Sequence, residues 1–256
     1  MTGRLQGKTA LVTGSTSNIG QAIAEVFAAE GAHVVVSGRN TGRGAAVVAG
    51  IRAAGGRADF VAADLDGSAE ASRALAEEAT AALGGRIDVL VNNAGVYPSP
   101  STTDTDEKTF DHVYAVNVKA PFFLTAAVAP AMAATGGGTI INLGSWIARL
   151  GVPAGALYSS TKGAMETLTR AWSAEFGPRG VRVNAVSPGV ILPPAPEGST
   201  PGPGQVMMHG TPSGTVGEPA AIAHAALWLA SDEASFVHGT VVDVDGGRTG
   251  VAVVAA

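Results

Sequence analysis

The feature that most constrains the fold is a regular alternation of short β-branched runs with longer alanine-rich helical patterns along the 256 residues. Strands and helices that alternate at this spacing indicate right-handed βαβ units, and therefore a parallel sheet with helices on both faces. The runs are continuously apolar, as strands buried on both faces are. The predicted strands are 9–13, 33–37, 58–62, 87–91, 138–143, 181–186 and 240–244.

Helical patterns fill the intervals between these strands. The predicted helices are 19–30, 43–54, 68–83, 106–134, 157–176 and 219–231. No linker divides the chain and no short-period repeat is present. We therefore predict a single α/β domain over residues 1–256, built on a doubly wound parallel sheet of about seven strands with helices on both faces.

One segment interrupts the alternation. Residues 191–217 are rich in Pro and Gly, with Met207, Met208 and His209 in the middle. The segment follows the sixth strand, and loops at the carboxyl ends of parallel strands meet ligands. Long loops in compact domains are usually functional. We predict a mobile substrate lid here; a loosely ordered surface loop is the alternative.

Composition restricts the class of protein. The chain is 46% hydrophobic and 14% charged, which is typical of a compact globular protein. A net charge of −5 without a basic cluster argues against nucleic acid or an anionic membrane as the main partner. Cysteine is absent and the N-terminus has no apolar signal region, so we expect a soluble, cytoplasmic protein. The five histidines form no metal-binding pair, and we expect no metal site.

A turn of small residues follows the first strand. Residues 13–20 read Thr-Gly-Ser-Thr-Ser-Asn-Ile-Gly and run directly into a helix. Small residues allow the backbone to approach a pyrophosphate, and the first N–H groups of the helix favour its negative charge. An ordinary tight turn is the alternative, but the position after the first strand favours nucleotide binding.

Tyr158 and Lys162 are four residues apart, and Ser145 precedes the tyrosine by thirteen. Positions i and i+4 share one face of a helix, so the ammonium can lie beside the phenol. A nearby positive charge favours phenolate, which would make the tyrosine usable as a proton donor or acceptor near neutral pH. Ser145 offers a hydroxyl that could hold a substrate oxygen. An exposed helix pair is the alternative for the two residues alone.

Together these motifs resemble those of the short-chain dehydrogenase/reductase family, which has a Rossmann-like fold, and the resemblance extends from about residue 5 to residue 247. The motifs that carry it occur in the family's order: the turn at 13–20, Asp64, Asn92-Asn93-Ala94-Gly95, Asn117, Ser145, Tyr158 with Lys162, Ser187-Pro188-Gly189 and Val244-Asp245-Gly246-Gly247.

The resemblance implies a catalytic set. Tyr158 would be the general acid in reduction and the base in oxidation. Lys162 would lower the pKa of the tyrosine and hold the nicotinamide ribose. Ser145 would bind the substrate oxygen, and Asn117 would hold a water that connects Lys162 to solvent. Trp146 and Tyr97 are expected to flank the substrate, with packing alone as the alternative.

The resemblance also implies a dinucleotide site along the carboxyl ends of the strands. The residues expected to bind the cofactor are Gly14, Ser17, Asn18, Ile19, Gly20, Arg39, Asp64, Leu65, Asn93, Ala94, Gly95, Tyr158, Lys162, Pro188, Gly189 and Ile191. The chain departs from the family at Asn18, where glycine is usual; asparagine tolerates the left-handed conformation that the turn needs. It departs again after Gly189, where the run Val-Ile-Leu-Pro-Pro lacks the usual threonine.

The end of the second strand bears on cofactor choice. NAD-preferring relatives commonly carry an acid where this chain has Gly38, and Arg39 follows it. This combination offers space and charge for a 2′-phosphate, so we predict NADP(H) over NAD(H). The alternative is that Arg39 is a solvated arginine, since Ser17 stands where some NADP-binding relatives have a second basic residue.

The sequence thus predicts an oxidoreductase that interconverts a ketone and a secondary alcohol with NAD(P)(H). An NAD-dependent alcohol or sugar-alcohol dehydrogenase is the first alternative, and a non-catalytic nucleotide-binding regulatory protein is the second. The expected partners are a small carbonyl or alcohol substrate and further copies of the chain. Apolar residues such as Phe122 and Trp172 on the helices predict a homotetramer or dimer.

Overall fold

The seven predicted strands form one all-parallel sheet in the order β3-β2-β1-β4-β5-β6-β7. The structure is a computed structural model, and it describes residues 3–98, 100–153, 155–193 and 202–252. The strands are β1 (Thr9–Val12), β2 (His33–Gly38), β3 (Arg57–Ala62), β4 (Val89–Asn92), β5 (Gly138–Leu143), β6 (Val181–Pro188) and β7 (Val241–Val244). The chain order reverses between β1 and β4, which places the switch point of the sheet there.

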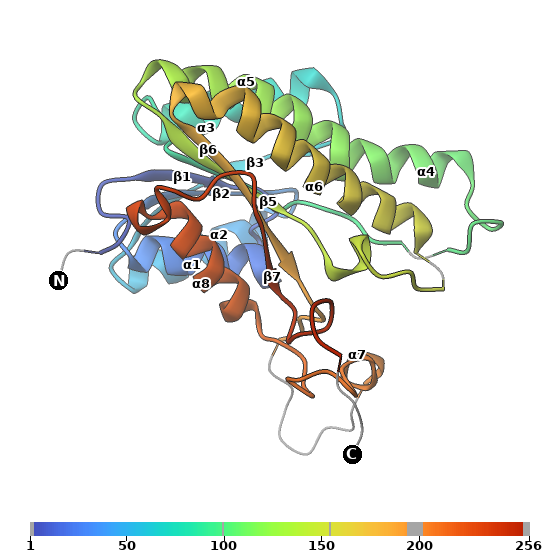
Figure 1. Cartoon of the computed structure of the whole chain (residues 1–256). Helices are drawn as coiled ribbons and strands as arrows, with labels where there is room; N and C mark the ends of the chain where they lie inside the picture. Colours follow the sequence, from blue (N-terminus) through green and yellow to red (C-terminus); the bar gives the residue numbers. More distant parts are fainter. Residues whose placement is uncertain (1–2, 99, 154, 194–201, 253–256) are drawn as a thin grey trace.

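Helices cover both faces of the sheet (Figure 1). The helices are α1 (Asn18–Ala29), α2 (Thr41–Ala53), α3 (Ala69–Ala82), α4 (Glu107–Tyr114), α5 (Ala120–Ala134), α6 (Ala156–Phe176), α7 (Pro203–Met207) and α8 (Pro219–Ala230). One buried cluster joins α1, α2 and α8 to the sheet, and a second joins α3, α5 and α6 to its other face. The prediction of a doubly wound α/β fold is confirmed.

Alternate side chains along each strand belong to different halves of the core, one on each face of the sheet. In β1, Ala10 and Val12 belong to the α1–α2–α8 side, whereas Leu11 between them belongs to the α3–α5–α6 side. All three are fully buried. Successive side chains of a strand point to opposite faces, so a continuous apolar run is what a strand covered on both faces requires.

Capping residues fix where several helices begin. The side chains of Asn40, Ser68 and Asp106 accept hydrogen bonds from backbone N–H groups in the first turns of α2, α3 and α4. These are the residue types that cap helices best. The N-cap of α1 is Ser17, and no side chain of the described residues caps this helix.

The long helix predicted over 106–134 is interrupted. A π-helical segment, η1 (Ala115–Lys119), separates α4 from α5. Single π-turns inside helices occur mostly at functional sites, and sequence periodicity does not reveal them. By length and composition the helical run 107–134 could cross a membrane, but half of its most apolar window is buried inside the protein. α5 packs on α3, as expected for a core helix of the domain.

The predicted lid extends from the carboxyl edge of the sheet (Figure 1). A single parallel bridge between Ile191 and Gly217 closes its base. Within it, α7 is a short helix, and Met208 directly after α7 is almost fully buried. Residues 194–201 of the predicted lid lie outside the described residues.

Candidate active site

The strand ends at the switch point are joined by hydrogen bonds. The Asn93 amide after β4 donates to the carbonyls of Thr13 and Gly14 after β1, at 2.8 and 3.0 Å. The Thr13 hydroxyl accepts from the backbone N–H groups of Asn93 and Ala94, both at 3.0 Å. These contacts hold the turn after β1 against the loop after β4, where ligands bind in open parallel sheets.

The turn after β1 has no space for side chains at its glycines. A Cβ at Gly14 would lie 2.8 Å from the Ala94 Cα, and one at Gly20 would lie 2.4 Å from the Gly14 carbonyl oxygen. Gly14 has φ +62°. Asn18 has φ 49° and is the sole non-glycine residue with positive φ in the described part of the chain. The expectation that asparagine can replace glycine at this point is therefore confirmed.

The second strand ends with Gly38 and Arg39 beside the turn. Arg39 Nε lies 3.9 Å from a carboxylate oxygen of Asp64, and both side chains are mostly exposed. Leu65, next to Asp64, is buried. A Cβ at Gly38 would lie 2.9 Å from the Thr16 methyl group, so a side chain at this position would require Thr16 to shift. The predicted adenine-side residues thus lie together at one edge of the site.

Tyr158 and Ser145 meet at the carboxyl edge of β5. Tyr158 lies in the first turn of α6, and Ser145 is the N-cap of the short 3-10 helix η2 (Trp146–Ala148). Burial raises the pKa of the Tyr158 phenol to about 12, and a side-chain hydrogen bond with Ser145 acts in the opposite direction. A phenol that shares a hydrogen bond with a serine hydroxyl can transfer a proton to an oxygen held between them.

Lys162 lies one turn further along α6 and is buried. Its ammonium donates a 2.9 Å hydrogen bond to the Leu143 carbonyl, and Nζ is 5.6 Å from the centroid of the Tyr158 ring. Burial lowers the pKa of Lys162 to about 8. The pKa of Tyr158 is thus raised overall, because burial of the phenol is the largest influence on it, and the expected lowering by Lys162 stays a prediction.

Asn117 lies on the π-helical segment η1, two per cent exposed. Its amide exchanges two hydrogen bonds with the backbone of Val96, each 2.8 Å long, and donates a third to the Thr161 hydroxyl at 3.2 Å. Thr161 precedes Lys162 on α6. Asn117 therefore connects the loop after β4 with the helix that carries Tyr158 and Lys162.

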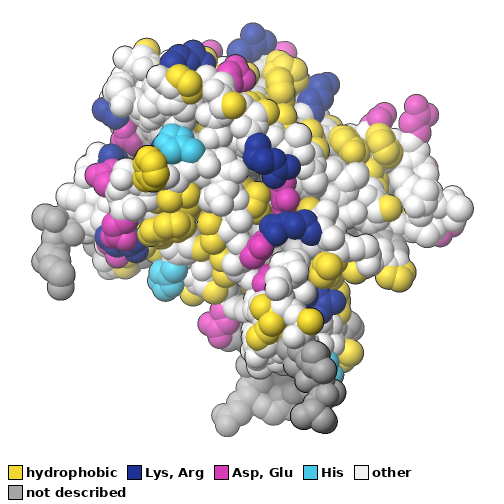
Figure 2. All heavy atoms as spheres, viewed as in Figure 1, with side chains coloured by type: hydrophobic (Ala, Val, Ile, Leu, Met, Phe, Trp, Pro, Cys, Tyr) yellow, Lys and Arg dark blue, Asp and Glu magenta, His cyan; other side chains and the backbone are white. Residues whose placement is uncertain are grey.

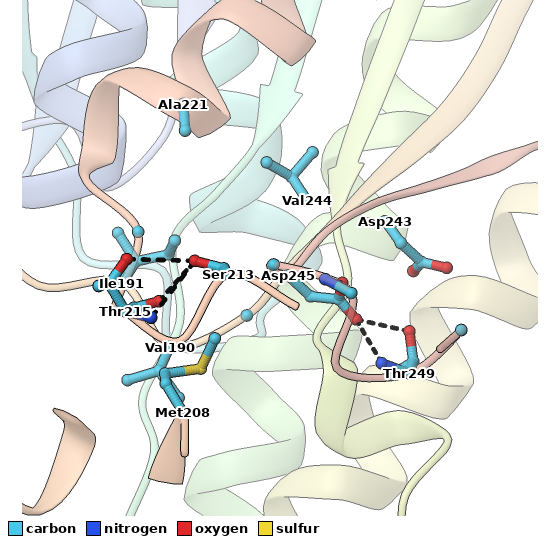
Figure 3. Close-up of a pocket in the computed structure, with 15 residues that line it drawn as sticks. Val190, Ile191, Met208, Ser213, Thr215, Ala221, Asp243, Val244, Asp245 and Thr249 are labelled. Carbon is cyan, nitrogen blue, oxygen red and sulfur yellow. Dashed lines mark hydrogen bonds between the residues drawn. The ribbon is translucent and has the colours of Figure 1, made fainter. Parts of the chain in front are cut away.

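Of the residues predicted at the nicotinamide end, Gly189 and Ile191 but not Pro188 border a cavity of about 460 Å³, which Figure 3 shows. Gly189 and Ile191 line it together with the base of the lid and the turn after β7, whereas Asn117, Ser145, Tyr158 and Lys162 do not. A Cβ at Gly189 would lie 2.6 Å from the Asp245 Cα, so close approach of the turn after β7 requires this glycine. The lining has hydrogen-bonded polar pairs of its own, such as Thr249 with Asp245, but it includes none of the four predicted catalytic residues.

The two residues predicted to flank the substrate, Tyr97 and Trp146, differ in how far they are exposed. Tyr97 is 77% exposed, and its ring meets that of Tyr158 edge-on with centroids 6.3 Å apart. Trp146 is 5% exposed, and the guanidinium of Arg248 lies 4.4 Å above its ring. In this structure Tyr97 borders the space next to the phenol, whereas Trp146 is packed beneath an arginine.

Several residues around the site were not predicted. Glu166, Arg149 and Asp243 form a group of charges beside Ser145 and α6. The signal in the sequence was a glutamate four residues after Lys162, on the helix face that also carries Tyr158 and Lys162. Thr161, which binds Asn117, gave no signal, because this contact depends on how α4–α5 and α6 pack.

The residues at the switch point fit a dinucleotide. The glycines at 14 and 20 allow the turn to pack closely against Ala94 and its own backbone, and the first N–H groups of α1 are uncapped by any described side chain. Such N–H groups and the helix dipole favour a pyrophosphate. The cradle therefore suits the phosphates of a nicotinamide dinucleotide.

Comparison with known proteins agrees with this geometry. Residues 14–249 match the family described as Enoyl-(Acyl carrier protein) reductase. The cyclopentanol dehydrogenase of Comamonas sp. is 36% identical over 249 residues, which cover 96% of this chain and 99% of that protein. The chain belongs to the short-chain dehydrogenase/reductase family.

Two solved structures in this family hold different cofactors. A 7α-hydroxysteroid dehydrogenase complexed with NADH and 7-oxo glycochenodeoxycholic acid has a TM-score of 0.87 and 38% identity, and the match covers 95% of each chain. The gluconate 5-dehydrogenase of Burkholderia cenocepacia in complex with NADP and tartrate has a TM-score of 0.88 and 32% identity, over 97% of each chain. The protein described here is an NAD(P)(H)-dependent oxidoreductase that interconverts alcohol and ketone groups.

Proposed function

We propose that Tyr158 is the general acid of ketone reduction and the general base of alcohol oxidation. The observation that carries this assignment is the position of its buried phenol, which lies within reach of the Ser145 hydroxyl and one helical turn from Lys162. Proton transfer by a positioned side chain typically contributes about 10²–10⁴-fold to a rate. A bound NAD(P)(H) would supply or accept the hydride.

Three residues support the tyrosine in this proposal. Ser145 donates a hydrogen bond to the substrate oxygen and stabilises the charge that develops there. Lys162 holds the ribose of the cofactor. Asn117 holds the loop after β4 to α6 through Val96 and Thr161, and a water beside it would relay the proton to solvent.

We propose NADP(H) as the preferred cofactor, with the predicted set of residues from Gly14 to Ile191 as its binding site. Support comes from Gly38, which brings no acid to the ribose edge, and from Arg39, whose exposed guanidinium lies at that edge. Asp64 lies 3.9 Å from the same guanidinium and weakens its attraction for a phosphate. NAD(H) is the alternative.

The substrate is proposed to be a small or moderately apolar carbonyl compound that enters beneath the lid at 191–217. Support comes from the apolar residues of the lid, among them Met207 and Val206, which are exposed on α7. Tyr97 would contact this substrate because its ring lies beside the Tyr158 phenol. Trp146 would act from beneath the site, by packing.

We propose a cytoplasmic homotetramer or dimer assembled through the helices α4–α6. Phe122 and Phe110 expose 43% and 48% of their surface on these helices. Phe122 packs against Trp172 of α6, with ring centroids 5.9 Å apart. Charges of both signs are scattered over the face shown in Figure 2, without an extended area of one sign, and this distribution favours neither nucleic acid nor an anionic membrane as a partner.

The test of the proposed chemistry is Tyr158→Phe. The ring keeps its packing and loses only the hydroxyl, so kcat on an alcohol that the wild type oxidises should fall by about 100-fold or more. The Kd of both cofactors, followed by nicotinamide fluorescence, should stay within about twofold. A variant that keeps most of its kcat would show that Tyr158 is not the acid or base.

A further inference from the structure

The serine at the proposed catalytic centre stands on a weak local element. Ser145 caps η2, which has three residues, and its hydroxyl is 3.5 Å from the Ile147 N–H. A 3-10 helix of this length has little stability of its own. Gly144 before it is held to Val186 of β6 at 2.8 Å, and beyond that point the position of Ser145 depends on contacts between η2 and the rest of the protein.

The residue that follows η2 makes such contacts. Arg149 binds Asp243 of β7 with both terminal nitrogens of its guanidinium, one of them at 2.7 Å. Its Nε lies 3.5 Å from a carboxylate oxygen of Glu166 on α6. One guanidinium thus joins η2, the edge strand of the sheet and the helix that carries Tyr158. The ion pairs raise the pKa of Arg149, chiefly through the hydrogen bond with Asp243.

Glu166 is the buried member of this group. Its side chain is 9% exposed, and one carboxylate oxygen has no hydrogen-bond partner among the described residues. That oxygen would lie 3.4 Å from a Cβ at Gly144, so the carboxylate rests against the backbone between Leu143 and Ser145. A buried carboxylate is costly unless a positive charge compensates it, and Arg149 is the cation that lies against it.

Glu166 and Lys162 therefore both reach the backbone just before Ser145. Glu166 lies one turn after Lys162 on α6, and Lys162 donates to Leu143, two residues before Ser145. On the opposite side of η2, the Arg248 guanidinium covers Trp146 and donates to the Met207 carbonyl of α7. Arginines thus hold η2 at both ends.

We propose that Arg149 is a positioning residue: its ion pairs with Glu166 and Asp243 fix η2, and hence the Ser145 hydroxyl, relative to Tyr158. The proposal rests on the proposed roles of Ser145 and Tyr158. A displacement of about 1 Å in a reacting group can reduce a rate by about 100-fold. Loss of Arg149 should consequently reduce kcat without touching the cofactor cradle at the switch point, because the ion pairs of Arg149 join only η2, β7 and α6.

The experiment compares Arg149→Met with Arg149→Lys, Glu166→Gln and a matched control, Arg4→Met. Arg4 also binds a carboxylate with a forked pair, to Glu233 at 2.9 and 2.6 Å, and its side chain is 33% exposed, close to the 36% of Arg149. Each variant is measured for Tm, cofactor Kd, KM and kcat on one alcohol that the wild type oxidises. Tyr158→Phe accompanies them as the test of the chemistry itself.

Arg149→Met should lose about tenfold to 100-fold in kcat, with cofactor Kd within about twofold and a fall in Tm no larger than that of Arg4→Met. Arg149→Lys should regain part of the loss, since lysine keeps the charge but cannot bridge both carboxylates. In the double variant Arg149→Met/Glu166→Gln the effects on kcat should not add.

A kcat within about twofold of wild type in Arg149→Met, or a fall in Tm alone, would overturn the proposal. Should this variant fail to fold, Arg149→Lys and Glu166→Gln carry the same test, and unchanged kcat in both would overturn it equally. Full activity in Tyr158→Phe would instead refute the proposed chemistry, whatever the Arg149 variants do.

Discussion

Lys162 points its ammonium at the Leu143 carbonyl, 2.9 Å away, while its Nζ stays 5.6 Å from the ring centroid of Tyr158. The two residues respond to the same burial in opposite ways. Burial lowers the pKa of the lysine to about 8 and raises that of the tyrosine to about 12, because each is pushed towards its neutral form. Both shifts make stability depend on pH in the alkaline range.

The sign of the lysine effect follows from proton binding. Between its folded pKa of about 8 and its ordinary value of 10.5, the unfolded chain holds a proton that the folded chain has lost. Stability therefore rises with pH through this window. Between about 10 and 12 the folded chain keeps the Tyr158 proton and the unfolded chain loses it, so stability falls there.

We predict that the wild type gains stability relative to Lys162→Met as pH rises from about 7.5 to 9.5, by about 2 kcal/mol. Urea unfolding at several pH values measures the difference, and effects of other groups cancel in it. The methionine keeps the length of the side chain without the charge. A difference that stays constant to about 0.5 kcal/mol would mean that Lys162 keeps its ordinary pKa.

The fold could be predicted because each buried run in the sequence is also a strand that helices cover on both sides. Leu11 illustrates this, since it is apolar like Ala10 and Val12 although it faces the other helical layer. The break at 115–119 could not be predicted, because η1 keeps the same apolar pattern as an α-helix. Within it, Asn117 binds the backbone of Val96 across the site, a contact between distant residues that no local pattern reports.

The candidate site was predictable in its residues but not in its electrostatics. Tyr158, Ser145 and Lys162 do lie together, as their spacing and the family resemblance implied. The expected effect of Lys162 on the phenol rested on helix geometry and on the family resemblance, and neither shows how much water the packing of α6 removes. Likewise, the pairing of Arg149 with Asp243 joins residues 94 positions apart, which no local pattern reports.

Gly14 gives a prediction on the cofactor cradle. In Gly14→Ala a methyl group would meet the Ala94 Cα at 2.8 Å, with φ at +62°. We expect the Kd of NADH and of NADPH to rise by about tenfold or more, together with a loss of about 1–3 kcal/mol in stability from backbone strain. Fluorescence titration and urea unfolding measure the two effects.

Gly50→Ala is the matched control for this variant. Gly50 lies in α2, and a Cβ there would have no heavy atom within 4 Å. The substitution should stabilise the helix by about 0.5–1 kcal/mol and leave cofactor affinity unchanged. Equal cofactor affinity in Gly14→Ala and Gly50→Ala would show that the turn does not carry the phosphates.

The proposed assembly gives another prediction. Phe122→Asp places a charge on the exposed part of α5, beside Trp172. If this face is an interface between copies, light scattering at micromolar concentration should show a smaller species than the wild type. Val206→Asp, on the exposed side of α7, should leave the mass unchanged. A wild type that is already monomeric would contradict the proposal.

The proposed cofactor preference rests on Arg39, whose side chain is 66% exposed and whose Nε lies 3.9 Å from a carboxylate oxygen of Asp64. An exposed contact of this kind is screened, so we expect it to favour NADPH over NADH by about 1–2 kcal/mol, or about five- to thirtyfold in affinity. Arg39→Ala should weaken NADPH binding by that factor and leave NADH nearly unchanged. The advantage of NADPH should shrink as salt rises.

A variant designed to prefer NADH must take account of Thr16, because this residue lies against Gly38. Gly38→Asp alone would press its Cβ against the Thr16 methyl group at 2.9 Å, so a loss of affinity for both cofactors could come from the displaced turn. Thr16→Ser removes that methyl group and keeps the hydroxyl. In Thr16→Ser/Gly38→Asp the new carboxylate should repel a 2′-phosphate and accept a hydrogen bond from a 2′-hydroxyl, which reverses the preference to NADH.

Titration of both cofactors into Thr16→Ser, the double variant and Arg39→Ala decides the matter. If wild type binds NADH and NADPH equally, or if Arg39→Ala weakens both to the same degree, Arg39 is a surface charge and does not select the cofactor.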